Sequence, residues 1–226
     1  MKILNLYACL GGNRYKWNEV KEDIEVTAIE LDPELARLYQ ERFLNDTVII
    51  ADAHQYLLDH YKEYDFIWSS PPCPTHSRIN TSYKNQKNQV IRYAKMELYQ
   101  EIILLMQFFD GKYCIENVIP YYEPLIEAKK RGRHLYWTNF NLPNILSKRK
   151  TVVSGNMNDS LRKRYKHESD VKRLSKFHDY DFTKYKGKQR MDKVARNLVD
   201  YEAGKTILET VIGITTSENI NQKKLF

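Results

Sequence analysis

Residues 65–77, Asp-Phe-Ile-Trp-Ser-Ser-Pro-Pro-Cys-Pro-Thr-His-Ser, combine an abrupt structural break with a reactive side chain. The apolar run 66–68 stops at Pro71 and Pro72, and the thiol of Cys73 follows at once. Proline fixes its own φ and disfavours helix in the preceding residue, so a strand that ends here passes into a rigid loop. Such a loop presents Cys73 at the carboxyl end of a strand, where open α/β sheets bind ligands. The alternative is an ordinary turn in which the cysteine is a small buried hydrophobe.

A glycine turn and two acids stand at the ends of three further apolar segments. Segment 2–7 runs into Tyr7-Ala8-Cys9-Leu10-Gly11-Gly12, where glycine lets the backbone approach a ligand closely. Segment 24–30 ends in Glu30, which suits two ribose hydroxyls, and segment 48–50 is followed by Asp52, which suits an adenine amino group. A glycine turn and two acids at strand ends form the arrangement of an S-adenosylmethionine site. The alternative is that these acids are helix caps, Asp52 above all.

Strand and helix patterns alternate along the chain and predict the elements that position these residues. The predicted strands are 2–7, 24–30, 48–50, 66–68, 112–116 and 133–140. The predicted helices are 13–21, 33–43, a segment capped by Asp52, 90–109 and 201–212. The alternation predicts an α/β fold with a doubly wound, mostly parallel sheet. With the S-adenosylmethionine arrangement at its strand ends, this fold resembles the S-adenosylmethionine-dependent methyltransferase type, to which a small basic lobe is attached.

The positive charge is concentrated in one region. From Asn144 to Arg190, Lys and Arg outnumber Asp and Glu by 14 to 5, although the whole chain has a net charge of only +7. This distribution indicates a lobe that binds a polyanion, attached to a nearly neutral scaffold. The alternative is a solvated charge run without a binding function.

The composition excludes several classes of protein. The 226 residues are 42% hydrophobic and 12% aromatic, which is typical of a globular chain with its own core. We expect no membrane span and no signal peptide. The three cysteines are an odd number without a repeated spacing, which favours reduced thiols and a cytoplasmic location. Cys73 and His76 could form half of a metal site, but no second pair has ligand spacing, so we expect no metal.

With these residues in view, the chain resembles the DNA cytosine-5 methyltransferase family. Five motifs occur in the family's order and span nearly the whole chain. They are the cofactor turn at 7–12, Pro72-Cys73 with Ser77 four residues after the cysteine, Glu116-Asn117-Val118, Arg131-Gly132-Arg133, and Asn197-Leu198-Val199. The ordered set is much more specific than any one motif.

The resemblance implies roles for individual residues. Cys73 is the nucleophile that adds to carbon 6 of a flipped-out cytosine, Glu116 is the acid near N3, and Arg133 holds the carbonyl oxygen of the base. The implied cofactor contacts are Tyr7, Ala8, Leu10, Gly11, Gly12, Glu30, Leu31, Asp52, Ala53, Pro72, Leu98 and Asn197. Core packing is the alternative for Leu31 and Leu98.

The same resemblance implies the domain organisation and the partners. Residues 1–143 form the catalytic core, 144–190 a short basic target-recognition region, and 191–226 a segment that returns to the core. The implied substrate is double-stranded DNA, bound by a monomer in a bacterial or viral intracellular setting, at the nucleoid, with DNA methylation of the restriction–modification kind. RNA such as tRNA is the alternative substrate, and a non-catalytic nucleic-acid-binding protein is the alternative outside enzymes.

The chain also departs from the family pattern. Cys9 replaces the first glycine of the cofactor turn, and Pro74 stands where many members have Gln. The region between the Arg-x-Arg and Asn-x-Val motifs is short, so we expect phosphate contacts there and a short or relaxed target sequence.

Overall fold

The computed structural model describes residues 1–78, 80, 92–147 and 170–214. The chain forms two compact units from interleaved segments. Unit 1 comprises Met1–Tyr7, Ile24–Leu31 and Asn45–Asn144, and unit 2 comprises Ala8–Asp23, Asp32–Leu44 and Ile145–Phe226.

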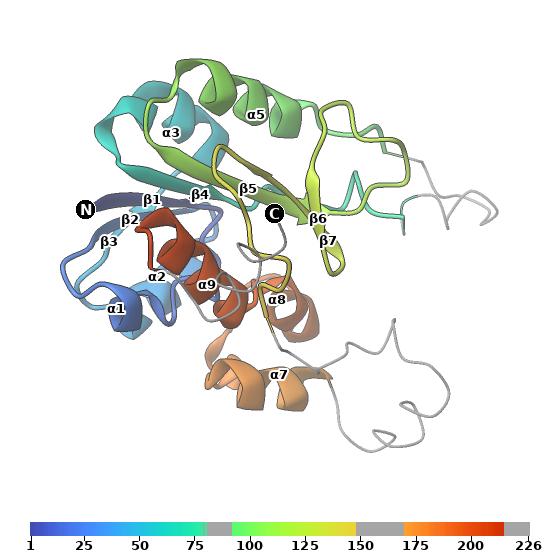
Figure 1. The fold of residues 1–226 in the computed structure, drawn as a ribbon. Helices are drawn as coiled ribbons and strands as arrows, with labels where there is room; N and C mark the ends of the chain where they lie inside the picture. Colours follow the sequence, from blue (N-terminus) through green and yellow to red (C-terminus); the bar gives the residue numbers. More distant parts are fainter. Residues whose placement is uncertain (79, 81–91, 148–169, 215–226) are drawn as a thin grey trace, which may run out of the picture. The chain divides into compact units, whose positions relative to one another are not determined.

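Unit 1 contains a seven-stranded sheet with the order β3-β2-β1-β4-β5-β7-β6 (Figure 1). The strands are β1 (Lys2–Leu6), β2 (Glu25–Glu30), β3 (Thr47–Ile50), β4 (Phe66–Ser69), β5 (Lys112–Val118), β6 (Lys129–Arg131) and β7 (His134–Thr138). Strands β1 to β5 pair in parallel, and β7 is antiparallel to both β5 and β6. The order reverses its direction between β1 and β4, which confirms the predicted α/β class with a doubly wound, mostly parallel sheet.

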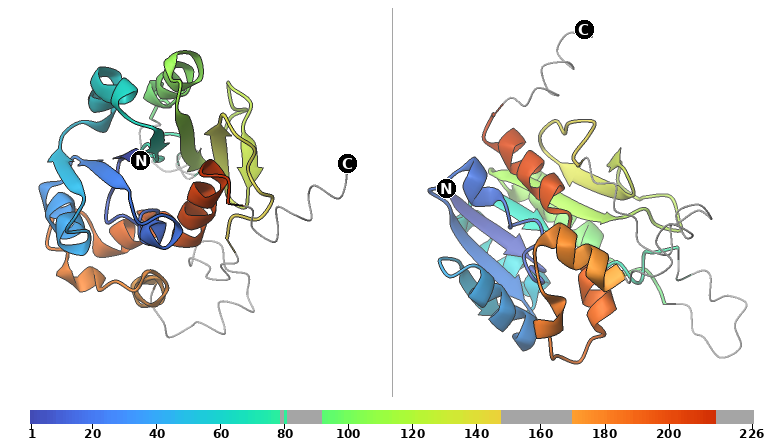
Figure 2. Two further views of the ribbon diagram at one scale, coloured as in Figure 1. Left: turned by 60° about the vertical axis from the view of Figure 1, so that its left-hand side comes forward. Right: turned by 90° about the horizontal axis from the view of Figure 1, so that it is seen from below.

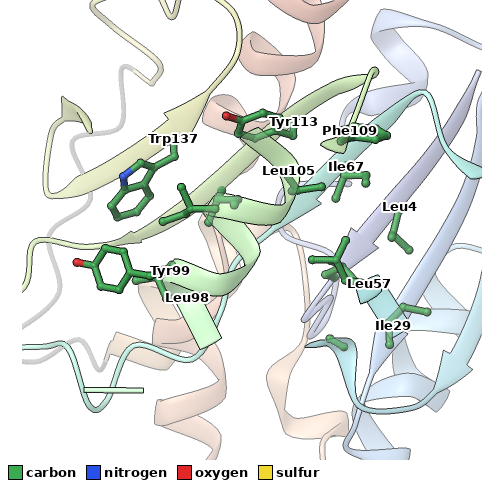
Figure 3. Packing of buried hydrophobic residues seen from close by; sticks show 14 of the residues in the cluster. Leu4, Ile29, Leu57, Ile67, Leu98, Tyr99, Leu105, Phe109, Tyr113 and Trp137 are labelled. Atoms are coloured by element: carbon green, nitrogen blue, oxygen red, sulfur yellow. The ribbon is translucent and has the colours of Figure 1, made fainter. Parts of the chain in front are cut away.

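Helices α3 (Ala53–His60) and α5 (Glu97–Phe108) lie side by side on one face of this sheet (Figures 1 and 2). The predicted cap at Asp52 is confirmed, because its side chain accepts a hydrogen bond from the backbone N of Gln55 at 2.9 Å. Leu98, Tyr99 and Leu105 of α5 pack with apolar residues of the strands in one buried cluster (Figure 3). This cluster fixes α5 against the sheet.

Unit 2 is helical and has its own core. Its elements are α1 (Trp17–Val20), α2 (Pro33–Arg42), α7 (Asp170–His178), the 3₁₀ turn η3 (Phe182–Lys184), α8 (Met191–Asn197) and α9 (Tyr201–Val211). Leu35 and Leu38 of α2 are buried with Leu174, Phe182 and Val194. Segments that are far apart in the sequence thus share one core, and α7 and α8 lie against each other (Figure 1).

The structure corrects several predicted elements. The helix predicted at 90–109 begins at Glu97, because the backbone N of Arg92 and of Lys95 bond to the side chains of Asn80 and Thr75 instead of to a helical turn. The segment 13–21 forms a helix only at Trp17–Val20. Strand β6, which the sequence reading missed, forms a hairpin with β7 through Gly132 at φ +57°.

The final part of the basic region contains α7 and η3. Leu174 of α7, Phe182 of η3 and the following Tyr185 are buried. Residues 148–169, including Lys163, Arg164 and Lys166 of the predicted phosphate-binding surface, lie outside the described part of the chain. Among the described residues, no helix combines the length and the apolar character that crossing a membrane requires.

Candidate active site

The carboxyl ends of four neighbouring strands place chemically useful side chains in one row of unit 1. The register aligns Leu6 of β1 with Ile29 of β2 and with Ser69 of β4, and aligns Ser69 with Ile115 of β5. The next residues along these strands are Tyr7, Glu30, Ser70 and Glu116. The sequence therefore brings an aromatic ring, a hydroxyl and two carboxylates to the edge where the strand order reverses, which is the ligand-binding edge of such sheets.

The loop after β4 is folded and fixed at both ends. The backbone N of His76 and of Ser77 both donate to the carbonyl of Cys73, at 3.0 and 2.9 Å. Pro71 is buried, Pro72 is exposed, and Cys73 is a half-buried cysteine. The cysteine thus sits in a tight turn with access to solvent, as a nucleophile requires.

This Pro-Pro-Cys loop is joined to the segment that follows β5. The side-chain amide of Asn117 donates to the carbonyl of Pro71 at 3.0 Å, and Ser77 forms a β-bridge with Pro120. The buried ring of His76 lies 2.5 Å from the hydroxyl of Tyr122, and burial lowers the pKa of His76. The Pro-Cys and Glu-Asn-Val motifs, at residues 72–73 and 116–118, thereby form one structural piece.

Glu116 is buried and lies among polar groups. Ser70 donates to its Oε2 at 3.1 Å, and the ring nitrogen Nε1 of Trp68 donates to the Ser70 hydroxyl at 2.8 Å. The Nδ1 atom of His134, from β7, lies 3.3 Å from Oε1 of Glu116. The sequence analysis did not identify Ser70 and His134 as partners of Glu116. The one available signal was the position of Ser70 at the end of an apolar strand.

The two arginines of the Arg-x-Arg motif differ. Arg131 donates to the carbonyls of Pro143 and Leu142, at 2.5 and 3.0 Å, and so fixes the chain after β7. Arg133 is exposed in the hairpin that follows Gly132. The structure thus gives Arg131 a structural task, while Arg133 keeps a side chain that a ligand can reach.

The remaining predicted residues of unit 1 have different degrees of burial. Glu30 is half-buried at the end of β2, and Asp52 is exposed at the N-terminus of α3, where it acts as the cap. Ala53 is buried in the first turn of that helix. Leu98 is 3% exposed and belongs to the core, whereas Leu31 is 65% exposed. The core-packing alternative therefore holds for Leu98 in this structure, and Leu31 is open to solvent.

The glycine turn belongs to unit 2 and is closely packed by its own chain. A Cβ atom on Gly12 would lie 2.2 Å from the carbonyl oxygen of Val199, and one on Gly11 would lie 2.3 Å from the ring of Phe43. Both distances are too short for a real contact, so packing within the protein already requires glycine at both positions. The Asn-x-Val motif thus lies directly against the glycine turn, through Leu198 and Val199.

Other residues of this turn are equally fixed. Cys9 adopts φ +50°, a left-handed conformation that glycine occupies without strain and that costs other residues roughly 1 kcal/mol. The turn continues with the backbone N of Gly11 donating to the carbonyl of buried Ala8 at 2.8 Å. Leu10 is fully buried, and Arg42 donates to its carbonyl at 3.0 Å. Asn197 is exposed at the end of α8.

Comparison with known proteins gives a family match. A family described as C-5 cytosine-specific DNA methylase matches residues 1–124. A search of the curated proteins found no match.

Several solved structures are similar to the chain. One is a DNMT2 mutant from Spodoptera frugiperda, with 25% identity and a TM-score of 0.37 over 52% of this chain and 35% of that one. A putative methyltransferase, yhhF, from Escherichia coli has 13% identity and a TM-score of 0.38 over 61% of this chain and 73% of that one. A TehB-like SAM-dependent methyltransferase from Corynebacterium glutamicum has 18% identity and a TM-score of 0.34 over 52% and 54% of the two chains.

Proposed function

Because the chain belongs to the C-5 cytosine-specific DNA methylase family, we propose that it methylates carbon 5 of a cytosine in DNA through a covalent bond to Cys73. The observation that carries this proposal is the junction of two loops in unit 1. Asn117 holds the carbonyl of Pro71, and Ser70 bonds to Glu116, so the thiol loop and the buried carboxylate are fixed to the same strand ends. This is the pair of groups that the reaction needs.

The chemistry explains why a thiol and an acid are needed together. Carbon 5 of cytosine is a poor nucleophile while the ring is aromatic. When the Cys73 thiolate forms a bond to carbon 6, N3 takes a proton from Glu116 and carbon 5 becomes enamine-like. After carbon 5 has gained the methyl group, its proton leaves to solvent, the bond between carbon 6 and sulfur breaks, and the proton on N3 returns to Glu116.

The residues around Glu116 fit this task. Its burial excludes water from the acid, and Ser70 and His134 provide polar contacts to its two oxygens. A carboxyl group that gives and regains a proton next to a buried base is stabilised in both states by such partners. We assign Arg133, exposed and close in sequence to His134, to the carbonyl oxygen of the base.

The cofactor of the family is S-adenosylmethionine, which supplies an electrophilic methyl group on a sulfonium centre. The residues at the strand ends fit it chemically. Glu30 offers a half-buried carboxylate for the ribose hydroxyls, and Asp52 offers an exposed one for the adenine amino group. We assign Tyr7 to the adenine ring, and Gly11, Gly12 and Asn197 to the methionine end.

A base inside a stacked duplex cannot reach a cysteine at a strand end, so the proposal includes base flipping. The excess of Lys and Arg in residues 144–190 supports a polyanionic substrate. DNA is the substrate named in the family description, and the same charge would also hold RNA. The experiment must therefore offer both.

The protein is incubated with S-adenosylmethionine carrying a labelled methyl group and with either duplex DNA or tRNA, and the labelled base is identified. We expect 5-methylcytosine in DNA. Label in tRNA alone would replace the DNA proposal with the RNA alternative. Label in neither, with no binding of the cofactor, would contradict a methyltransferase function.

A further inference from the structure

Glu101 is a carboxylate that the proposed reaction does not use, yet it lies completely inside unit 1. Its exposed fraction is 0%, and its neighbours on the same face of α5, Leu98, Ile102 and Leu105, belong to the apolar core. A buried charge of this kind is expensive unless hydrogen bonds surround it. The residues that form hydrogen bonds with Glu101 therefore indicate its role.

Three polar groups converge on Glu101. The hydroxyl of Tyr7 donates to Oε1 at 2.6 Å, and the hydroxyl of Ser69 donates to Oε2 at 2.7 Å. The Nδ1 atom of His54 lies 3.2 Å from Oε1. Both carboxylate oxygens of Glu101 therefore have hydrogen-bond partners within the protein.

The partners come from three segments that end at the predicted cofactor site. Tyr7 follows β1, Ser69 is the last residue of β4, and His54 stands two residues after Asp52 in the first turn of α3. Tyr7 also has φ +55°, a left-handed conformation that a tyrosine adopts only when its surroundings enforce it. The hydrogen bond to Glu101 anchors the side chain of this residue.

The protonation states agree with this geometry. Burial first, and then the charge of Glu101, raises the pKa of Tyr7 far above its ordinary value, so its hydroxyl remains a donor. The hydrogen bond to Glu101 is the main cause that raises the pKa of His54, and the charges of Glu97 and Asp52 raise it further. His54 thus stays protonated to higher pH than a free histidine and balances the buried carboxylate.

We propose that Glu101 is a positioning residue for S-adenosylmethionine, which holds the ends of β1 and β4 and the start of α3 in the arrangement that binds the cofactor. The inference rests on the proposed function only through its cofactor. Glu101 does not touch the ligand. It acts through Tyr7, whose ring it fixes at the end of β1.

The test is isothermal titration of the purified protein with S-adenosylhomocysteine, which reports binding without any methyl transfer. Glu101→Gln keeps the size of the side chain and removes its charge, and Tyr7→Phe keeps the ring and removes one donor. Each should raise Kd about tenfold, as expected when a charged hydrogen bond is lost. Because both changes break the same contact, the double variant should bind more tightly than the product of the two single effects predicts. Glu63→Gln, which removes the charge of an exposed carboxylate in the same unit that is paired with His60, is the control and should bind like the wild type.

The outcomes separate this inference from the proposed function. A wild-type protein that fails to bind S-adenosylhomocysteine overturns the cofactor assignment itself. A wild-type protein that binds, together with a Tyr7→Phe variant of unchanged Kd, overturns only the role of Glu101. If Glu101→Gln does not fold, Tyr7→Phe decides alone, since it leaves the buried carboxylate with Ser69 and His54.

Discussion

The side-chain amide of Asn117 donates a hydrogen bond to the carbonyl of Pro71 at 3.0 Å, and both groups are buried. The carbonyl belongs to the residue two positions before Cys73, and the amide to the residue after Glu116. One hydrogen bond therefore sets the distance between the loop of the proposed nucleophile and the strand of the proposed acid. The oxygen of the same side chain accepts from the backbone N of Val118 at 2.9 Å, which fixes the orientation of the amide.

Replacing Asn117 should disturb both stability and activity. In Asn117→Asp, a carboxylate oxygen replaces the amide donor and faces the carbonyl of Pro71, so two acceptors meet in a buried place. We expect a loss of about 2 kcal/mol in the free energy of unfolding, measured with urea, and a clear loss of methyl transfer. Asn45→Asp, which changes an exposed asparagine of the same unit, is the control. Equal losses of stability and activity in the two variants would contradict a specific role for the hydrogen bond between Asn117 and Pro71.

Removal of the proposed nucleophile should separate binding from chemistry. Cys73→Ala should lower the rate of methyl transfer by roughly 10⁴-fold or more, because an essential covalent step is lost, while Kd for S-adenosylhomocysteine remains that of the wild type. DNA with 5-fluorocytosine should form a covalent adduct with the wild type but not with Cys73→Ala, detected as a shifted band on a denaturing gel. Cys9→Ala, which changes another half-buried thiol, should still form the adduct. An adduct with Cys73→Ala would contradict the assignment of the nucleophile.

The hydroxyl of Ser70 should matter through Glu116. Ser70→Ala removes the donor to Oε2 and leaves the ring nitrogen of Trp68 without its acceptor. We expect a loss of roughly tenfold in kcat, corresponding to one hydrogen bond, with little change in KM for the cofactor. Single-turnover kinetics measure this. A change in KM alone would mean that Ser70 serves binding and not the acid.

The stability of the Pro-Pro-Cys loop should depend on pH through His76. Burial lowers the pKa of His76 in the folded state, so the unfolded chain binds its proton more readily. The contribution of His76 is therefore complete above about pH 6.5 and is lost as the pH falls below that value. His54 has the opposite sign: its raised pKa gives a contribution that is complete below about pH 6.5 and is lost as the pH rises through its folded-state pKa.

Thermal unfolding of the wild type and of His76→Gln between pH 5 and 8 tests this dependence. We expect the variant to be less stable by roughly 1 kcal/mol at pH 8, because the bond to Tyr122 is weakened, and the difference in Tm to shrink as the pH falls. A difference that stays constant from pH 8 to pH 5 would contradict the predicted titration of His76.

Glycine at position 12 should be essential for folding of unit 2. A methyl group on Gly12 would meet the backbone of Val199 at 2.2 Å, and backbone cannot move aside as a side chain can. We expect Gly12→Ala to cost about 3 kcal/mol, at the upper end for an overpacked site. Gly132→Ala is the comparison: its Cβ has open space, so only the strain of φ +57° remains, roughly 1 kcal/mol. Similar losses for the two variants would argue against the contact with Val199.

Local patterns predicted the strands and the helix caps well. The strand that ends at Ser69, the Asp52 cap and helix α9 each depend on a few neighbouring residues, so the sequence carries their signals directly. The family motifs also predicted the family, and the match over residues 1–124 includes the three motifs at 7–12, 72–77 and 116–118.

The missed features depend on residues that are distant in the sequence. Strand β6 is Lys129-Lys130-Arg131, which has no apolar pattern and exists because β7 pairs with it. Glu101 was not among the predicted site residues, since its partners Tyr7 and Ser69 belong to segments that are distant in the sequence. The prediction that α5 begins near residue 90 was wrong, because the side chains of Asn80 and Thr75 accept hydrogen bonds from the backbone N of Arg92 and Lys95.

The contact between Gly12 and Val199 also constrains the order in which the chain can fold during synthesis. The glycine turn at Gly12 packs against Val199, which is synthesised almost 190 residues later. In the same way, the ring of Trp17 donates to the carbonyl of Gly204 at 3.1 Å, a partner that is also synthesised late. Once about residue 138 has been synthesised, every strand of the unit 1 sheet has its partner strands. The glycine turn still lacks its contacts with Leu198 and Val199 at that stage. A nascent chain that is halted between these stages should protect its sheet from proteolysis and leave the glycine turn open.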